Sequence, residues 1–469
     1  MPEPGPLFWF TSFADVKAPF YAIRFDKFGE LASPKTVAEL VKRLESNDFT
    51  DVIVCAHGWN NIWKDALANY KGFIDRLAEI HARTGVRPTR PYRPLVIGVF
   101  WPSTSLVLPW EQGPRIAGQG GGDAEVLDEW EVDDQSVVAE SVAPGDLAEF
   151  YELSEADTLD AAGARRLAEL LLSAAGDGED ELPTAATETT VEDVLDTWRE
   201  YSQPNAAGKV APGRGGRRVP ADEDPDAAAE AGREDAGAPV AAGAPDLDPR
   251  AVLRLFTVRT MKDRAGKVGV RGVGDLLRRT MAAAHGAHFH LVGHSYGARV
   301  LLNAVARPDG GPLPPVRSLL LLQPAVNHLC FAEELAELGG APGGYRAALD
   351  RVEQPVLTTF TRHDFPLRKV FHHALFRPGD IGEILVAGDD DPPPSIYAAL
   401  GGYGPRRIPP SPSVTMKEPA GAPAEADFYD LTKAAPQVTA INGTALISGH
   451  GDVITTATAW ALLNLLLAE

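Results

Sequence analysis

The chain has 469 residues, of which 44% are hydrophobic and 23% are charged, enough for one large core with an appendage or for two or three domains. Its 65 acidic and 44 basic residues give a net charge of −21, which argues against broad nucleic-acid binding because a phosphate backbone requires a basic surface. Two cysteines, Cys55 and Cys330, are too few for a disulfide framework or a four-thiolate zinc site. We therefore expect two buried free thiols in a reducing, cytoplasmic compartment.

The first hundred residues alternate between strand and helix patterns. Continuous apolar runs such as Val52-Ile53-Val54 are typical of strands buried on both faces. The predicted elements are strands at 20–25, 51–55 and 94–101, a helix capped by Ser33 with Pro34 at its first position, and a helix at 63–83. Strands that alternate with helices in this way predict parallel pairing.

The alternation stops after residue 102. Residues 121–200 contain 24 acidic and 3 basic residues, so the acidity of the chain belongs to this segment, where only 157–174 and 190–201 have helical spacing. Residues 203–246 have almost no large apolar side chains and are predicted to be disordered. We therefore divide the chain into a first core part (1–102), an acidic insertion (103–249) and a second core part (250–469). Three roles are open for the insertion: a cap over the site, a solvated, flexible shield with no catalytic part, or a docking arm for a protein partner.

Alternation resumes near residue 250. The predicted helices are at 250–258, 270–284, 296–306, 331–351 and 453–467, and the predicted strands are at 288–292, 316–322, 356–361 and 438–447. With about seven strands in all, we predict an α/β fold with one mostly parallel, twisted sheet and helices on both faces. No stretch reaches the ~18 apolar residues of a membrane span, and no secretory signal is visible, so we expect a soluble protein.

The strongest local motif is Gly293-His294-Ser295-Tyr296-Gly297, between a predicted strand and a predicted helix. Glycines two positions to either side of a serine allow a sharp turn that exposes the hydroxyl, because a Cβ there would collide with the strand and the helix. The motif therefore predicts that Ser295 is a nucleophile on an elbow.

A serine hydroxyl needs a base, and the base needs a carboxylate that orients it. His450 follows the last predicted strand and is the leading candidate for the base, with His372 and His373 among its competitors. Asp364 follows the strand at 356–361 and is the leading acid. Asp380 is the alternative acid, while Asp452 is too close in sequence to His450 to fit well.

The oxyanion of an acyl-transfer reaction needs two preorganised donors. The backbone N–H of Tyr296, directly after the serine, is one candidate. The second is expected from the loop that follows the strand at 51–55, where the sequence reads His57-Gly58-Trp59-Asn60-Asn61. We predict the Trp59 N–H as this donor, with His57 and Gly58 supporting the loop.

Two further groups of residues were weighed for binding roles. His285, His288, His290 and His294 cluster in sequence but do not have the spacing of a metal site, so neither a metal nor a cofactor is predicted. The second group consists of tryptophans that either form an apolar substrate pocket or simply pack the loops: Trp59, Trp63, Trp101 and Trp110.

These motifs resemble the α/β-hydrolase superfamily over roughly residues 20–102 and 250–469. The chain order Ser295, Asp364, His450 is the order that family uses, and the His57-Gly58-Trp59 loop is similar to its oxyanion loop. With Phe100-Trp101-Pro102-Ser103, that loop resembles a poorly characterised esterase-like branch. The resemblance implies a serine hydrolase that cleaves a small-molecule or lipid-like carboxylic ester through an acyl-enzyme. The alternatives are a catalytically silent binding or scaffold protein and an acyltransferase with the same triad.

Overall fold

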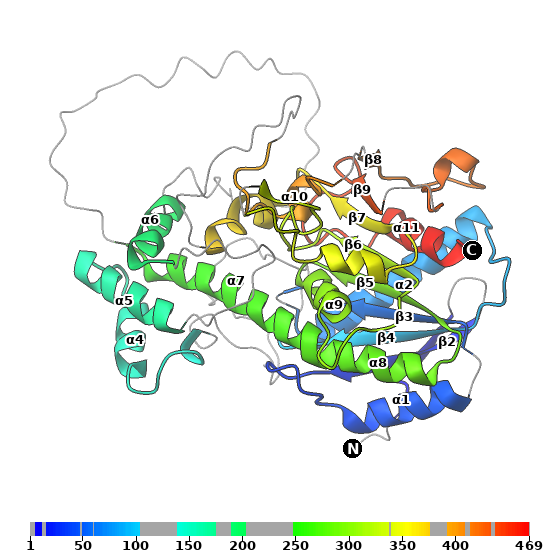
Figure 1. Ribbon diagram of the computed structural model, residues 1–469, viewed down its shortest axis with the longest axis horizontal. Coiled ribbons are helices and arrows are strands. Elements are labelled where there is room, and N and C mark those ends of the chain that lie inside the picture. The colour runs from blue at the N-terminus through cyan, green and yellow to red at the C-terminus, as the bar shows by residue number, and fades with distance from the viewer. Residues whose placement is uncertain are drawn as a thin grey trace, which may run out of the picture.

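The computed structural model describes residues 5–11, 16–46, 49–59, 61–103, 138–174, 189–202, 247–336, 339–375, 392–408, 413–432 and 437–468. One sheet of nine strands forms its centre, in the order β1-β2-β4-β3-β5-β6-β7-β9-β8 (Figure 1). The strands are β1 (Phe8–Thr11), β2 (Lys17–Arg24), β3 (Asp51–Ala56), β4 (Pro94–Phe100), β5 (His288–His294), β6 (Ser318–Leu322), β7 (Val356–Phe360), β8 (Val414–Thr415) and β9 (Val438–Asn442). Only β1 pairs antiparallel.

The prediction of an α/β fold with a mostly parallel sheet is confirmed, but the count of seven strands is too low. The two strands that the sequence did not predict are β1 and β8, at opposite edges of the sheet. β1 alternates between half-buried and exposed residues, and β8 has 2 residues. The two residues of β8 are too few for the continuous apolar run that identifies the central strands. β1 does lie in such a run, Leu7-Phe8-Trp9-Phe10, and was missed.

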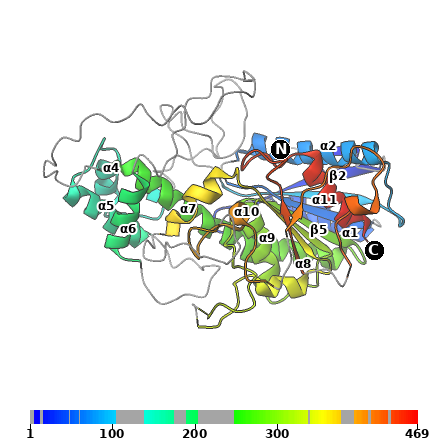
Figure 2. The ribbon, with the colours of Figure 1, turned by 90° about the horizontal axis from the view of Figure 1, so that it is seen from above.

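Helices cover both faces of the sheet. One face carries α1 (Pro34–Ser46), α8 (Gly274–Ala283) and α9 (Tyr296–Ala306), and the other carries α2 (Trp63–Thr84) and α11 (Thr456–Leu467). Figure 2 shows α2 and α8 on opposite sides of the strands. Successive residues of β3 enter different cores, because Val52 and Val54 belong to one cluster and Ile53 and Cys55 to the other.

A single long helical stretch replaces the two helices expected after residue 250. Helix α7 (Pro249–Lys267) continues through a π-helical turn, Val268–Val273, directly into α8. A Cβ at Gly272 would lie 2.6 Å from Cδ1 of Phe25, and one at Gly269 would lie 2.7 Å from Cβ of Asn303. The glycines of this turn therefore permit close packing against the core on two sides.

The described part of the insertion is helical and packs on α7. It contains α4 (Leu147–Ser154), α5 (Ala161–Ala174) and α6 (Val191–Tyr201), away from the sheet (Figures 1 and 2). Helix α5 contacts α4 and α6, which both contact α7. Phe150 and Trp198 are completely buried there, and the side chain of Thr190 caps α6. The expected disorder at 203–246 concerns residues outside those the structure describes.

The prediction of a helix at 331–351 is wrong. The chain forms turns there, and its last part is a short 3-10 helix, Arg346–Arg351. Gly339 and Gly340 have φ angles of 75° and 80°, which a right-handed helix cannot contain. The last strand also ends at Asn442 rather than at 447. Cys55 and Cys330 are both buried free thiols, as expected, and none of the described helices is long and apolar enough to cross a membrane.

Candidate active site

Ser295 stands on a sharp turn between β5 and α9. Its φ of 54° and ψ of −124° are unusual for a residue other than glycine. A Cβ at Gly293 would lie 2.7 Å from Cα of Ala298, and a Cβ at Gly297 would overlap the carbonyl oxygen of Ala56. Both flanking glycines are therefore required by the close approach of the backbone, and the turn has the geometry of a nucleophile elbow.

A continuous hydrogen-bond chain joins three side chains from three loops. Ser295 Oγ lies 2.8 Å from His450 Nε2, and His450 Nδ1 lies 2.8 Å from Asp364 Oδ2. The loops that carry them follow β5, β9 and β7, all at the carboxyl edge of the sheet. The structure thus brings the predicted nucleophile, base and acid together, in the order in which a proton would be relayed from hydroxyl to imidazole.

The carboxylate of Asp364 is fully buried and has a partner for each oxygen. Its Oδ1 accepts the backbone N–H of Leu367 at 3.0 Å, and its Oδ2 accepts the Gln323 side-chain amide at 3.1 Å in addition to His450. These donors hold the carboxylate in the position from which it contacts His450 Nδ1 and can orient the imidazole.

The loop after β3 lies directly against the nucleophile. A Cβ at Gly58 would be 2.7 Å from Cβ of Ser295, so only a glycine lets the loop approach this closely. Trp59 is the next residue after Gly58, so its backbone N–H belongs to this loop. Tyr296 is the first residue of α9, and its N–H belongs to the first helical turn, where donors lack intrahelical acceptors. The two predicted oxyanion donors therefore flank Ser295 from neighbouring segments.

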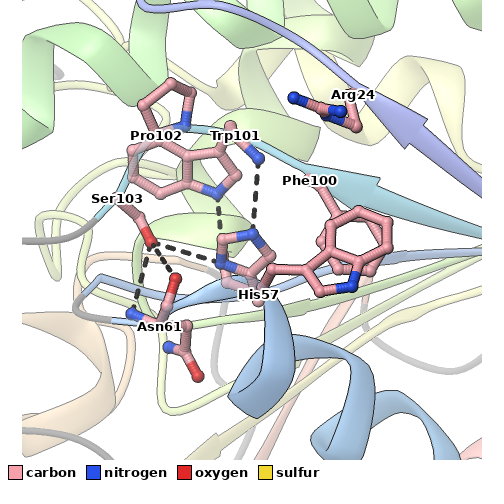
Figure 3. Close-up of a pocket in the computed structure, with 8 residues that line it drawn as sticks. Arg24, His57, Asn61, Phe100, Trp101, Pro102 and Ser103 are labelled. Carbon is pink, nitrogen blue, oxygen red and sulfur yellow. Dashed lines mark hydrogen bonds between the residues drawn. The ribbon is translucent and has the colours of Figure 1, made fainter. Parts of the chain in front are cut away.

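His57 fixes this loop rather than acting on a substrate. Its Nδ1 lies 2.9 Å from the Gly58 carbonyl. Figure 3 shows its two contacts with Trp101: His57 Nε2 lies 3.3 Å from the Trp101 backbone N, and the Trp101 indole donates to the His57 carbonyl at 3.0 Å. The two rings stack with an interplanar angle of 9°. Burial lowers the pKa of His57 to about 4, so a neutral ring with Nδ1–H as donor satisfies all of these contacts.

Several residues around His57 complete the support; the sequence motifs included Asn61 and Ser103 without giving them a role, and did not include Tyr70. The Asn61 side chain donates to the Gly58 carbonyl at 3.2 Å and to the Trp59 carbonyl at 2.9 Å, and the Ser103 hydroxyl donates to the Asn61 carbonyl at 3.2 Å (Figure 3). The Tyr70 hydroxyl accepts the His57 backbone N–H at 2.8 Å. The signal that could have found Ser103 is its place just after β4, at the same sheet edge as the nucleophile.

The remaining candidates lie elsewhere or have structural partners. Asp380 and Trp110 are outside the described residues. Asp452 accepts the backbone N–H and the hydroxyl of Ser448, at 2.9 and 2.8 Å. His372 and His373 pack ring against ring with centroids 4.2 Å apart. Trp63 stacks on Phe100 at 4.0 Å, and Trp63 and Trp101 both line a small pocket beside His57 (Figure 3).

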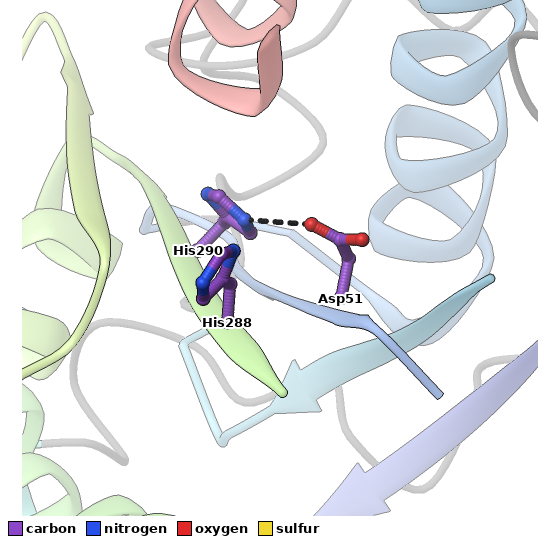
Figure 4. Close-up of side chains that lie close together, drawn as sticks. All are labelled: Asp51, His288 and His290. Carbon is purple, nitrogen blue, oxygen red and sulfur yellow. Dashed lines mark hydrogen bonds and ion pairs between the residues drawn. The ribbon is translucent and has the colours of Figure 1, made fainter. Parts of the chain in front are cut away.

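A second polar cluster lies at the opposite, amino edge of the sheet. Asp51, His288 and His290 place possible ligand atoms within 4.8 Å of one another (Figure 4). However, Arg90 donates to both oxygens of Asp51, at 2.6 and 2.8 Å, and His290 Nε2 lies 3.1 Å from Oδ1. A metal ion would have to share this carboxylate with a guanidinium cation, so we interpret the cluster as a buried ion-pair network.

The electrostatics of this network agree with that interpretation. Burial alone would raise the pKa of Asp51, but hydrogen bonds from Arg90, His290 and Thr50 hold it well below its usual range. Burial lowers the pKa of His290 despite the neighbouring carboxylate. His290 is therefore neutral near pH 7, donating from Nε2 and accepting the Ser318 hydroxyl at Nδ1, 2.7 Å away.

Comparison with known proteins gives no relative: no family model matches the chain, and neither a curated protein nor a solved structure is significantly similar to it. The site must therefore be interpreted from its own geometry. It lies where the connection from β3 to β4 runs to one side of β3 and the connection from β4 to β5 returns to the other side, the switch point at which open α/β sheets bind their ligands.

Proposed function

We propose that this chain is a serine hydrolase of the α/β-hydrolase type that cleaves a carboxylic ester through an acyl-enzyme. The observation that carries the proposal is the hydrogen-bond chain from Ser295 Oγ through His450 to Asp364, with both contacts at 2.8 Å. A serine, an imidazole and a buried carboxylate in this arrangement are suited to nucleophilic attack on a carbonyl carbon.

The reaction follows from the atoms in contact. His450 Nε2 takes the proton of Ser295 as Oγ attacks the ester carbonyl, and the resulting oxyanion is stabilised by the N–H groups of Trp59 and Tyr296. Collapse of this intermediate breaks the bond to the alcohol, which leaves with the proton from His450. A water molecule then attacks the acyl-enzyme with His450 again as base, which releases the carboxylic acid and restores Ser295.

Three further features support the same class. The triad residues occur in the order Ser295, Asp364, His450, and a glycine-containing loop after β3 lies against the nucleophile. Both agree with the chain order and the oxyanion-loop position of α/β-hydrolases. The strained φ of Ser295 is a third agreement, because nucleophile elbows hold this residue in an unfavourable conformation.

Labelling with a fluorophosphonate tests the proposal without knowledge of the substrate. The wild-type protein should form a covalent adduct at Ser295 and hydrolyse short p-nitrophenyl esters. Ser295→Ala should lose both properties. Ser448→Ala is the matched control, since Ser448 lies in the base loop but bonds to Asp452, and it should keep both.

The alternatives give different results in the same experiments. A silent scaffold would leave the wild-type protein unlabelled, and this outcome would refute the proposal. An acyltransferase would be labelled at Ser295 but would form a new ester or amide when an alcohol or amine acceptor is added. Product analysis with such an acceptor therefore separates transfer from hydrolysis.

A further inference from the structure

Gln323 is the side chain that joins the acid loop to the base loop. It follows β6 directly, and its Nε2 donates both to Asp364 Oδ2, at 3.1 Å, and to the carbonyl oxygen of Gly449, at 2.9 Å. Gly449 immediately precedes the base His450, whose ring bonds the same carboxylate oxygen. One amide group thus binds the acid Asp364 and the residue that precedes the base His450.

The orientation of this amide is fixed by its neighbours. Both contacts of Nε2 are to acceptors, a carboxylate and a carbonyl, so a flipped amide would place Oε1 against two oxygens. Oε1 itself is buried and has no donor among the described residues. Leaving this oxygen without a donor costs free energy. We infer that the two hydrogen bonds of Nε2 compensate for this cost and determine the orientation of the amide.

The backbone of Gln323 is also constrained. Its φ is 41°, in the left-handed region that residues other than glycine seldom adopt. Its N–H donates to Thr359 Oγ1 at 2.9 Å, and a Cβ at Gly401 would lie 2.5 Å from its carbonyl carbon. Strained residues held by several neighbours are concentrated at functional sites, and Gln323 shares this property with Ser295.

The base loop is held at two consecutive carbonyls. Gln323 binds the carbonyl of Gly449, and His294 Nε2 lies 2.9 Å from the carbonyl of His450. Burial, with the nearby His450, lowers the pKa of His294 to about 3, so His294 is neutral and donates its Nε2–H. The imidazole of His450 is therefore placed by donors from the ends of β5 and β6.

We propose that Gln323 is a positioning residue of the triad, which holds Asp364 and His450 in register and limits the negative charge that the carboxylate presents to the imidazole. This inference rests on the proposed hydrolase function. Without the amide, the base loop loses one anchor and Asp364 loses one donor. The uncompensated carboxylate then holds the proton on His450 more tightly, and a protonated base cannot accept the proton of Ser295.

Few charged or titratable groups among the described residues face His450, so a change in its interaction with Asp364 can be detected in the pH dependence. Asp364 contacts its Nδ1 and Ser295 its Nε2, while the neutral His294 ring lies with its centroid 5.0 Å away. Asp452, in the same loop, is engaged by Ser448. A shift in the pH dependence on replacing Gln323 therefore reports on the Asp364–His450 pair.

The test measures the rate of fluorophosphonate reaction at Ser295 from pH 5 to pH 9. Gln323→Met keeps the length of the side chain but removes both hydrogen bonds. We expect the rate to fall on the order of 10- to 100-fold, with the acidic limb of the profile displaced to higher pH. Gln323→Glu, which places a second acceptor against Asp364, should lose more at high pH than Gln323→Met and is the second variant if Gln323→Met does not fold.

Gln354→Met is the matched control. Gln354 is also buried, its Nε2 donates to the carbonyl of Leu465 at 3.2 Å, and its Oε1 has no described donor, but it precedes β7 at the opposite edge of the sheet. This variant should keep the wild-type rate and profile. Two results would overturn the inference about Gln323 but not the hydrolase function. One is a folded Gln323→Met variant whose labelling rate and acidic limb match those of the wild type, and the other is an equal change of both in Gln354→Met. Absence of wild-type labelling would instead overturn the hydrolase function on which it rests.

Discussion

Gly58 lies so close to Ser295 that a β-carbon at position 58 would be 2.7 Å from the β-carbon of the nucleophile. The contact joins the loop after β3 to the turn after β5, two strands that pair in parallel. It also fixes the distance between the Trp59 N–H and the hydroxyl that it is proposed to assist. The spacing of the oxyanion donors thus depends on a residue without a side chain.

Gly58→Ala should therefore displace the loop from Ser295. We expect kcat for p-nitrophenyl ester hydrolysis to fall on the order of 100-fold, the usual consequence of losing one oxyanion donor, while the fold persists. Gly421→Ala is the control, because a Cβ at this glycine also meets nothing within 4 Å, and its kcat should stay near that of the wild type. Equal kcat values for the two variants would contradict the assignment of the loop.

Replacing the acid tests the direction in which His450 is oriented. Asp364→Asn keeps the shape of the side chain but removes the negative charge that accepts the Nδ1–H. We expect kcat to fall on the order of 10⁴-fold, with a much smaller change in KM. The matched change Asp452→Asn, in the base loop, should have little effect. A modest loss in Asp364→Asn would point to another acid.

The ion-pair network at the amino edge should affect stability without affecting catalysis. Asp51 is fully buried and Arg90 donates to both of its oxygens. Arg90→Ala leaves that charge without its main partner, so we expect a loss of about 3–5 kcal/mol in the free energy of unfolding. Urea titration measures this loss. Arg76→Ala, which removes an exposed pair with Glu79, should cost less than about 1 kcal/mol.

Buried neutral histidines should make the fold sensitive to acid. Burial lowers the pKa of His57 to about 4, and lowers the pKa of His328 and His294 to about 3, whereas an unfolded chain protonates histidine near pH 6.5. Between these values the unfolded state binds more protons. The free energy of unfolding should therefore fall as the pH is lowered from about 6.5 towards 4, by up to about 1.4 kcal/mol per pH unit for each ring.

The variant His328→Gln should make this decline less steep, because it removes one buried ring that the unfolded state protonates. Urea unfolding at pH 7, 6 and 5 measures the slope. The exposed His285 supplies the control, since His285→Gln should leave the slope as it is. Unchanged slopes in both variants would contradict the role of the buried rings.

The central sheet and the triad were predictable because each depends on a local pattern. The apolar runs of β3, β4 and β5 identify strands buried on both faces, and a glycine-flanked serine between a strand and a helix identifies the elbow. The rule that functional loops follow the carboxyl ends of parallel strands then pointed to Asp364 and His450.

Other features depend on contacts between distant segments and leave little trace in the sequence. Gln323 binds Asp364 and Gly449, which are 41 and 126 positions away in the sequence. No local motif around Gln323 predicts these contacts. The helix expected at 331–351 fails because the glycine φ angles outweigh the apolar spacing. The join of α7 to α8 needs a π-helical turn, which apolar periodicity does not distinguish from a break.

The contact between α6 and the start of α7 has a consequence for how this protein can vary. The indole of Trp198 donates to the carbonyl of Asp248 at 2.9 Å, and Leu159 pairs with Leu247 through two backbone hydrogen bonds. The points where residues 203–246 leave and rejoin the described fold are thus already tied together. Since lengthening a closed loop costs little entropy, natural selection can add or remove residues here while the catalytic loops keep their positions.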